Sequence, residues 1–299
     1  MNVEDEDMVN KIVLITGANS GIGKETAIAL ARKGAHIIML CRNQEKAEKA
    51  MIEIKERANT EHVDLIIADL SDQKAIYSAV AQFKTKYNRL DVLINNAGSI
   101  LKERQETTEG YEMTFAVNHL GHFLLTLLLL DVLIRSEPSR IINVSSAAHR
   151  FGKLDFENIN LEEKYSSFRA YSNSKLANVL FTYELARRLE GTRVTVNALH
   201  PGVINSNFGR GQFSRFLTPF IATSTLFMID SEKGAETSVY LASSNEMKEV
   251  SGKYFKKKKA VKSSKASYNR EDQKKLWQLS LAMVNQHNLL LSNSALLKV

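Results

Sequence analysis

The sequence has little of what marks a secreted or membrane-spanning chain. Its one cysteine, Cys41, excludes an intrachain disulfide, so nothing requires an oxidising compartment. Residues 1–11 are acidic and carry no apolar stretch of the kind found in signal or transit peptides. The most apolar run, residues 123–134, contains Asp131 and is shorter than the roughly 18–20 residues that cross a bilayer, which favours a buried helix. We expect an intracellular protein, cytoplasmic or peripheral on an internal membrane such as endoplasmic reticulum, and not secreted.

Proline is also scarce, with three in 299 residues, and no repeat or linker divides the chain. We therefore expect a single domain over residues 1–299. The formal charge of +7 would suit a phosphate-rich ligand, an anionic membrane surface or nucleic acid. Nucleic acid is the least favoured of these, because few aromatic side chains are interleaved with the lysine run 256–259.

Apolar strand-like runs alternate with helical runs along the chain. Because strands apolar on both faces and separated by helices form parallel sheets, the sequence predicts an α/β fold. The expected architecture is a Rossmann-type doubly wound parallel sheet of about seven strands with helices on both faces. The predicted strands are 11–16, 35–41, 63–70, 91–98, 140–146, 193–202 and 251–255, and the main helices 24–34, 43–58, 72–87, 108–135, 168–190 and 271–286.

Two segments interrupt this alternation. Residues 203–230 are irregular and rich in phenylalanine, which suits either a substrate lid or a loop packed on the core. Residues 256–270 are polar and basic and are expected to be a flexible surface segment. The lysine run 256–259 would suit either a solvated face or contact with anionic lipid. The role of residues 286–299 is not indicated by their composition.

A glycine-rich turn, TGANSGIG, occupies residues 16–23 between the first strand and the first helix. Glycines at 17, 21 and 23 let the chain turn sharply and let a pyrophosphate approach the backbone. The amides at the start of the helix would then face the anion. The three glycines could be purely structural, but their position favours a nucleotide site.

The end of the second strand indicates which nucleotide. NAD-binding folds usually carry a carboxylate there to bind the ribose hydroxyls. Here Cys41 and Arg42 occupy the position, and a guanidinium can bind a 2′-phosphate. The sequence therefore predicts NADP(H) rather than NAD(H).

Lys175 follows Tyr171 by four positions, so on a helix the two residues share one face. Both could be solvated surface residues. Alternatively, the ammonium group would lower the pKa of the phenol from its usual value near 10 towards the range useful for acid–base catalysis.

Five motifs decide between these interpretations: TGANSGIG (16–23), NNAG (95–98), NVSS (143–146), YSNSK (171–175) and HPG (200–202). In this order they closely resemble the short-chain dehydrogenase/reductase family. VNHLGHFLLT (117–126) and the sequence of residues 171–191 are most similar to the retinol dehydrogenase branch. The resemblance fades after about residue 255.

The resemblance implies a role for each matching position. Tyr171 would be the general acid/base, and Lys175 would bind the nicotinamide ribose and lower the pKa of the tyrosine. Ser146 rather than the adjacent Ser145 would bind the substrate oxygen together with Tyr171, and Asn118 would hold a water in a proton relay. The implied cofactor contacts are Gly17, Ser20, Gly21, Ile22, Gly23, Arg42, Asp69, Leu70, Asn95, Ala97, Tyr171, Lys175, Pro201 and Ser206.

The function implied is an NADP(H)-dependent oxidoreductase that interconverts a lipophilic alcohol, retinol in the first instance, and its aldehyde or ketone. Alternatives are a broad carbonyl reductase for quinones, steroids or xenobiotic ketones, and a non-catalytic cofactor-binding regulator. No further cysteine, histidine or carboxylate completes a metal-ligand set with His119 and His122. We therefore expect these histidines to be packing or helix-surface residues. The apolar faces of helices 108–135 and 168–190 suit a homodimer or burial beneath the chain's own lid.

Overall fold

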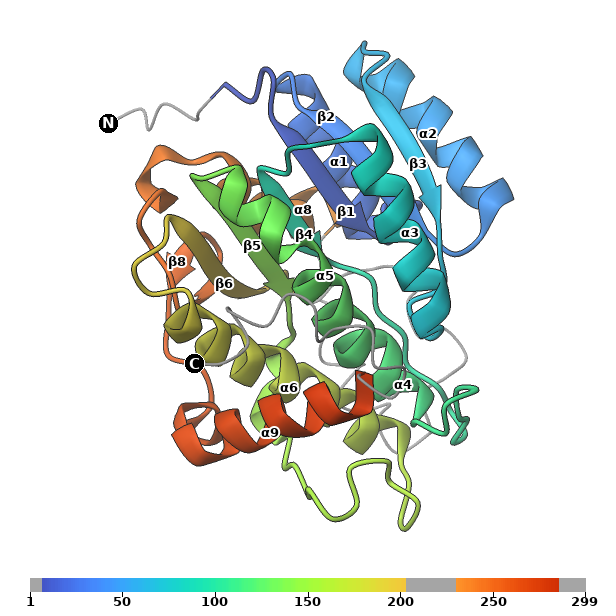
Figure 1. Ribbon diagram of the computed structural model, residues 1–299, viewed down its shortest axis with the longest axis vertical. Helices are drawn as coiled ribbons and strands as arrows, with labels where there is room; N and C mark the ends of the chain where they lie inside the picture. Colours follow the sequence, from blue (N-terminus) through green and yellow to red (C-terminus); the bar gives the residue numbers. More distant parts are fainter. Residues whose placement is uncertain (1–6, 203–229, 285–299) are drawn as a thin grey trace.

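The centre of the computed structural model, which describes residues 7–202 and 230–284, is a sheet of eight strands in the order β3-β2-β1-β4-β5-β6-β7-β8 (Figure 1). Neighbouring strands are parallel except for β8, which runs antiparallel to β7. The strands are β1 (Ile12–Thr16), β2 (His36–Cys41), β3 (Val63–Ile67), β4 (Val92–Asn95), β5 (Ser139–Val144), β6 (Val194–His200), β7 (Lys253–Lys256) and β8 (Lys259–Ala260). The expected α/β class is confirmed, with one strand more than expected.

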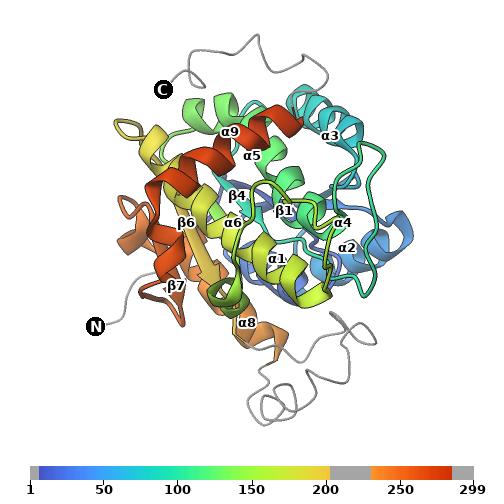
Figure 2. The ribbon, with the colours of Figure 1, turned by 90° about the horizontal axis from the view of Figure 1, so that it is seen from below.

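Helices cover both faces of this sheet (Figures 1 and 2). On one side lie α1 (Gly21–Arg32), α2 (Gln44–Ala58) and α8 (Ser231–Ser243). On the other lie α3 (Gln73–Lys86), α5 (Gly121–Arg135) and α6 (Ser167–Arg188), with α9 (Arg270–Val284) packed on α6. The short helical turns are α4 (Met113–Phe115), η1 (Ala116–Leu120), η2 (Ala147–Phe151), η4 (Asn245–Met247) and η5 (Lys265–Tyr268).

The apolar strands supply both layers of the core because successive side chains point to opposite faces. In β2, Ile37 and Met39 pack in the cluster beneath α1 and α2, whereas Ile38 and Leu40 pack in the cluster beneath α3 and α5. A strand buried on both faces is apolar at most of its positions, which is why these runs predicted a parallel sheet.

The long helix begins later than the expected residue 108. The Glu112 carboxylate accepts hydrogen bonds from the amides of Thr114, at 2.9 Å, and Phe115, at 2.7 Å, and so caps the helix start. The helical stretch Met113–Arg135 is long and apolar enough to cross a membrane by length and composition alone, but 72% of its most apolar window is buried inside the fold. The expectation of a buried helix is confirmed.

The chain's own C-terminal helix covers the apolar faces of α5 and α6 that had suggested a dimer (Figure 2). Trp277 of α9 lies 5.1 Å from the ring of Phe123 and 6.1 Å from that of Phe181, measured between ring centroids. The guanidinium of Arg188 lies 4.3 Å from the centre of the indole. The helix expected over 271–286 is therefore present, and Trp277 anchors it.

The basic segment 256–270 differs from the flexible surface segment that we expected. It contains β8 and η5, and Ser263, Ser264 and Ser267 are buried. Charge alone suggested a solvated segment, but the hydroxyls of Ser263 and Ser267 and the main-chain amide of Ser264 form hydrogen bonds within the fold. The lid proposed for 203–230 lies outside the described residues except for Asp230, which caps α8, and so do Ser206 and residues 286–299.

Candidate active site

The strand order places the residues of interest at a single edge of the sheet. β1, β2 and β3 extend the sheet in one direction, whereas β4, β5 and β6 extend it in the other, and ligands bind at this switch point between β1 and β4, beyond the carboxyl ends of the strands. The glycine turn follows β1, Ser146 follows β5, and Pro201 follows β6. The candidate site therefore lies at this edge.

Ser146 and Tyr171 lie together at this edge, close enough for the Ser146 hydroxyl to stabilise the charged form of the phenol. Ser146 caps η2, where its hydroxyl oxygen accepts a hydrogen bond of 3.2 Å from the amide of Ala148. The neighbouring Ser145 is buried and donates its hydroxyl to the carbonyl of Lys175 at 2.7 Å. The two serines thus face different partners, and the choice of Ser146 over Ser145 stays a prediction.

The pKa of Tyr171 differs from the expectation. Burial raises the pKa of this half-buried phenol, and the hydrogen bond with Ser146 opposes that effect in part. We had expected Lys175 to lower the pKa of the phenol. The direction is wrong for the chain alone because desolvation disfavours the phenolate more than its neighbours stabilise it.

Lys175 lies on the same side of α6 as Tyr171, with its ammonium 5.7 Å from the centre of the phenol ring. The Nζ atom donates a hydrogen bond of 3.0 Å to the carbonyl of Val144, the last residue of β5. Burial lowers the pKa of Lys175 to about 8. The helix therefore holds the ammonium beside the phenol, as the four-residue spacing predicted.

Asn118 occupies the π-helical turn η1, and both N–H groups of its side chain have acceptors. Its amide nitrogen donates to the carbonyl of Ser99 at 3.0 Å and to the hydroxyl of Ser174 at 2.9 Å, while its oxygen accepts from the amide of Ser99 at 2.7 Å. Ser174 in turn donates to the carbonyl of Tyr171 at 2.8 Å. Asn118 is thus connected to the helix that carries Tyr171.

His122 connects Asn118 to the glycine turn. The Thr16 hydroxyl oxygen accepts hydrogen bonds of 2.9 Å from the amides of Asn96 and Ala97, so its proton is free to point to His122 Nε2 at 2.8 Å. Nδ1 then carries the imidazole proton and donates it to the Asn118 carbonyl at 3.1 Å. A histidine four positions after Asn118 is the only feature of the motifs that points to this role.

The glycine turn fits a pyrophosphate. Gly17 adopts φ +68°, and a Cβ atom there would lie 3.0 Å from the Ala97 Cα; a Cβ at Gly23 would lie 2.5 Å from the Gly17 carbonyl oxygen. Ser20, at the N-cap of α1, forms no capping bond through its side chain. The amides of the first turn, which includes Gly21 and Ile22, are therefore left for an anion.

The resemblance implies that Asn95 lines the cofactor site, but its side chain points into the core. Its buried side chain donates to Thr126 at 3.0 Å and to Asn143 at 2.8 Å, so it braces β4 from within the core. The following residue, Asn96, contacts the glycine turn instead and donates to the Thr16 carbonyl at 2.8 Å. Sequence reasoning missed Thr16 and Asn96, although both belong to the motifs that it used.

Arg42 and Asp69 come together at the carboxyl ends of β2 and β3, with 3.6 Å between Arg42 Nη1 and Asp69 Oδ2. The Arg42 side chain is 71% exposed, so it can also reach a ligand. Leu70 packs closely against the start of α5, since a Cβ at Gly121 would lie 2.3 Å from the Leu70 carbonyl oxygen. Cys41 is buried, which raises the pKa of its thiol to about 11 and disfavours a reactive thiolate.

The two histidines of the long helix are buried and have separate partners. His119 bonds to the hydroxyl of Ser280 at 2.8 Å, whereas His122 bonds to Thr16. Within residues 7–202 and 230–284, no three His, Cys, Asp or Glu side chains gather as a metal site would require. Burial lowers the pKa of each histidine to about 3, which keeps both rings neutral.

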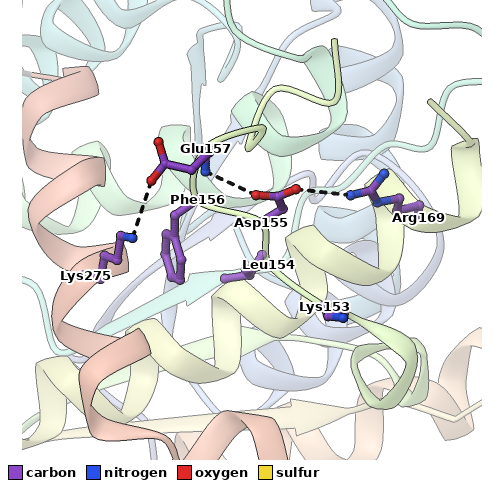
Figure 3. Close-up of a pocket in the computed structure, with 7 residues that line it drawn as sticks. All are labelled: Lys153, Leu154, Asp155, Phe156, Glu157, Arg169 and Lys275. Carbon is purple, nitrogen blue, oxygen red and sulfur yellow. Dashed lines mark hydrogen bonds and ion pairs between the residues drawn. The ribbon is translucent and has the colours of Figure 1, made fainter. Parts of the chain in front are cut away.

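A surface pocket of about 480 Å³ lies outside this group of residues (Figure 3). Its lining comes from the loop before α6, from Arg169 and from Lys275 of α9. The charges are internally paired, with Asp155 3.9 Å from Arg169 and Glu157 3.7 Å from Lys275. None of Ser146, Tyr171, Lys175 or Asn118 lines it.

Comparisons with known proteins agree with this geometry. The family model described as short chain dehydrogenase matches residues 11–215. Retinol dehydrogenase 13 of Homo sapiens is 46% identical over 279 residues, covering 92% of this chain and 84% of that protein. Retinol dehydrogenase 12 of Mus musculus is 43% identical over 281 residues, covering 92% and 86%. A solved structure from Mycobacterium Paratuberculosis has a TM-score of 0.76 at 34% identity, covering 94% of this chain and 96% of that one.

Fold and matches together define an oxidoreductase of the Rossmann type that acts on CH–OH groups and their carbonyl counterparts. The chain belongs to the short-chain dehydrogenase family. Within that family it falls in the retinol dehydrogenase branch.

Proposed function

We propose that the protein is an NADP(H)-dependent oxidoreductase that interconverts a lipophilic alcohol and its aldehyde or ketone, with retinol and retinal as the first candidates. The observation that carries this proposal is the placement of Tyr171 beside the Lys175 ammonium, 5.7 Å from the phenol ring, and beside the Ser146 hydroxyl, at the carboxyl edge of the sheet. Two hydroxyl donors directed to one place are what a reacting carbonyl oxygen requires.

The residues around the glycine turn would hold the cofactor. The first-turn amides of α1 would bind the pyrophosphate, Arg42 the 2′-phosphate, Asp69 the adenine side, and Lys175 the nicotinamide ribose. When bound, NADP(H) supplies or accepts the hydride at the substrate carbon. Ala97 follows β4 and Pro201 follows β6, and both would line the cofactor site.

The chain's own residues would manage the proton. In the direction of reduction, Tyr171 donates its phenolic proton to the carbonyl oxygen, while Ser146 donates a hydrogen bond to the same oxygen. A cationic Lys175 favours the phenolate that remains. Asn118 would hold the relay water through an oxygen atom, since both N–H groups of its side chain already donate to Ser99 and Ser174.

Two substrate classes fit this chemistry. Similarity to proteins named retinol dehydrogenases favours a retinoid substrate. A broad carbonyl reductase would instead accept quinones, steroids or xenobiotic ketones. Following NADPH absorbance against retinal, medium-chain aldehydes, steroids and quinones separates them. We expect retinal to show the highest kcat/KM. A quinone or steroid leading the panel would favour the reductase, and no turnover with any carbonyl would leave the cofactor-binding regulator.

The cofactor preference depends on Arg42. Replacing it by glutamine should raise the KM for NADPH by roughly 10- to 100-fold, because a charge-assisted contact with phosphate contributes about 1.5–3 kcal/mol. The KM for NADH should change less than twofold, since NADH lacks the 2′-phosphate. Arg135→Gln, which removes an exposed arginine in the last turn of α5, is the matched control. Equal use of both cofactors by the unaltered enzyme would contradict the preference.

A further inference from the structure

The main chain of Ser146 is held by a buried histidine that the proposed reaction does not use. His149 Nδ1 lies 2.6 Å from the Ser146 carbonyl oxygen, and the His149 amide donates to the same oxygen at 3.1 Å. The His149 side chain is fully buried, and its ring packs 4.7 Å from that of Tyr254. The main chain of the turn that carries Ser146 is thus held by two contacts from His149 to one carbonyl oxygen.

The proton on this imidazole can be assigned from its partners. The amide of Ser264 can only donate, so His149 Nε2, 3.0 Å away, must accept. Nδ1 then carries the proton and donates it to the Ser146 carbonyl. Burial lowers the pKa of His149, with Arg150 acting in the same direction, which keeps the ring neutral at pH 7.

Ser264 belongs to a segment, residues 262–267, that is fastened at several points. The Lys262 carbonyl accepts a 2.6 Å hydrogen bond from Arg150. The Ser263 hydroxyl lies 2.7 Å from that of Tyr183 and 2.6 Å from that of Ser267. The Ser267 carbonyl accepts a 2.6 Å hydrogen bond from Gln273 of α9. The segment is therefore tied to η2, to α6 and to α9.

Tyr183 lies on α6, the helix that also carries Tyr171. One route from the segment runs through Tyr183 along the rigid helix to Tyr171, and the other runs through His149 to Ser146. A second histidine, His200, supports the same turn, since its Nδ1 accepts from the Ala147 amide at 3.2 Å. The helix that carries Tyr171 and the turn that carries Ser146 are thus both bonded, directly or through His149, to residues 262–267.

We propose that His149 is a positioning residue: as a neutral, Nδ1-protonated ring, it couples residues 262–267 to the Ser146 turn and holds the Ser146 hydroxyl in place opposite Tyr171. This role rests on the proposed function of Ser146 and Tyr171. His149 acts through Ser146, since it bonds to the main chain of that residue rather than to its hydroxyl. Small displacements at a reacting centre can cost about 100-fold in rate, so such support affects turnover.

Two substitutions separate the two hydrogen bonds of the ring. In His149→Asn, the amide nitrogen takes the place of Nδ1 and keeps the donor to Ser146, but the contact with Ser264 is lost. In His149→Gln, the longer side chain places its oxygen near Nε2 and keeps the acceptor for Ser264, but the donor to Ser146 is lost. We expect His149→Gln to lower kcat by roughly 10- to 100-fold and His149→Asn by less than about threefold.

Further measurements distinguish positioning from a general loss of structure. The Kd for NADPH should stay within about twofold in both variants, because the glycine turn is not touched. Adding His149→Gln to Ser146→Ala should cause no more than about a twofold further loss in kcat, since the two changes act on one group. His36→Gln, which removes a histidine bonded to Asp64 on the opposite half of the sheet, should leave kcat unchanged.

A nitrogen-15 NMR spectrum of the imidazoles provides a readout without turnover. It should show His149 protonated at Nδ1 and unprotonated at Nε2, and the reverse tautomer would overturn the proposal. Full kcat in His149→Gln, equal losses in both variants that follow their melting temperatures, or additive losses with Ser146→Ala would also overturn it. Absence of turnover in the unaltered enzyme would instead reject the proposed function itself, and the positioning role with it.

Discussion

Replacing Tyr171 by phenylalanine is expected to lower kcat by roughly 10²- to 10⁴-fold, the contribution typical of a general acid. The change removes only the phenolic oxygen, so the ring and its position on α6 remain. Lys175 keeps its hydrogen bond to the Val144 carbonyl, and Ser174 still bonds to the main chain of residue 171. The fold and the binding of NADPH should therefore be preserved while the proton donor is lost.

The measurement is steady-state turnover of NADPH with a good carbonyl substrate, together with cofactor binding by fluorescence and the circular dichroism spectrum. Tyr77→Phe is the matched control, since the Tyr77 hydroxyl is buried on α3 and has no hydrogen-bond partner within the described parts of the chain. That variant should retain full kcat. Full activity in Tyr171→Phe would reject the catalytic role of the tyrosine.

Acidification should destabilise the protein well above the pH at which carboxylates titrate. Burial lowers the pKa of His119 and of His122 to about 3, against about 6.5 in an unfolded chain. Below pH 6.5 the unfolded state therefore binds more protons than the folded state, and the free energy of unfolding falls as the pH falls. Between pH 7 and pH 5 each of these histidines should cost about 2 kcal/mol.

A third histidine adds to this effect, because burial lowers the pKa of His200 to about 4, with Lys256 contributing. Urea unfolding at pH 7 and pH 5 would measure the loss, which should total at least about 4 kcal/mol. His119→Asn, which cannot be protonated in this range, should show a loss that is smaller by about 2 kcal/mol. Equal free energies of unfolding at the two pH values would show that these rings do not stay neutral.

The apolar runs predicted the parallel sheet because each strand contributes to both core layers, as Ile37 and Ile38 do on adjacent positions. The β7–β8 hairpin could not be predicted in the same way. Its turn residues, Lys257 and Lys258, both have positive φ, at 51° and 61°. Turns of this kind usually carry asparagine or glycine, so two lysines gave no signal of a turn.

The candidate site was predictable where a motif carries it and not where distant segments meet. Ser146, Tyr171 and Lys175 come from short motifs, and the structure brings them together. The pKa direction of Tyr171 was wrong because spacing shows the neighbouring charge but not the desolvation. His149 was missed because its partner Ser264 lies 115 residues further along the chain.

The position of α9 and of residues 262–267 has a consequence for biosynthesis. Every motif of the site has been translated by residue 202, yet His119 awaits Ser280, and His149 awaits Ser264. A nascent chain that has only just exposed YSNSK therefore carries the reactive side chains without the supports that orient them. The growing polypeptide would acquire the proposed catalytic geometry only when α9 has left the ribosome.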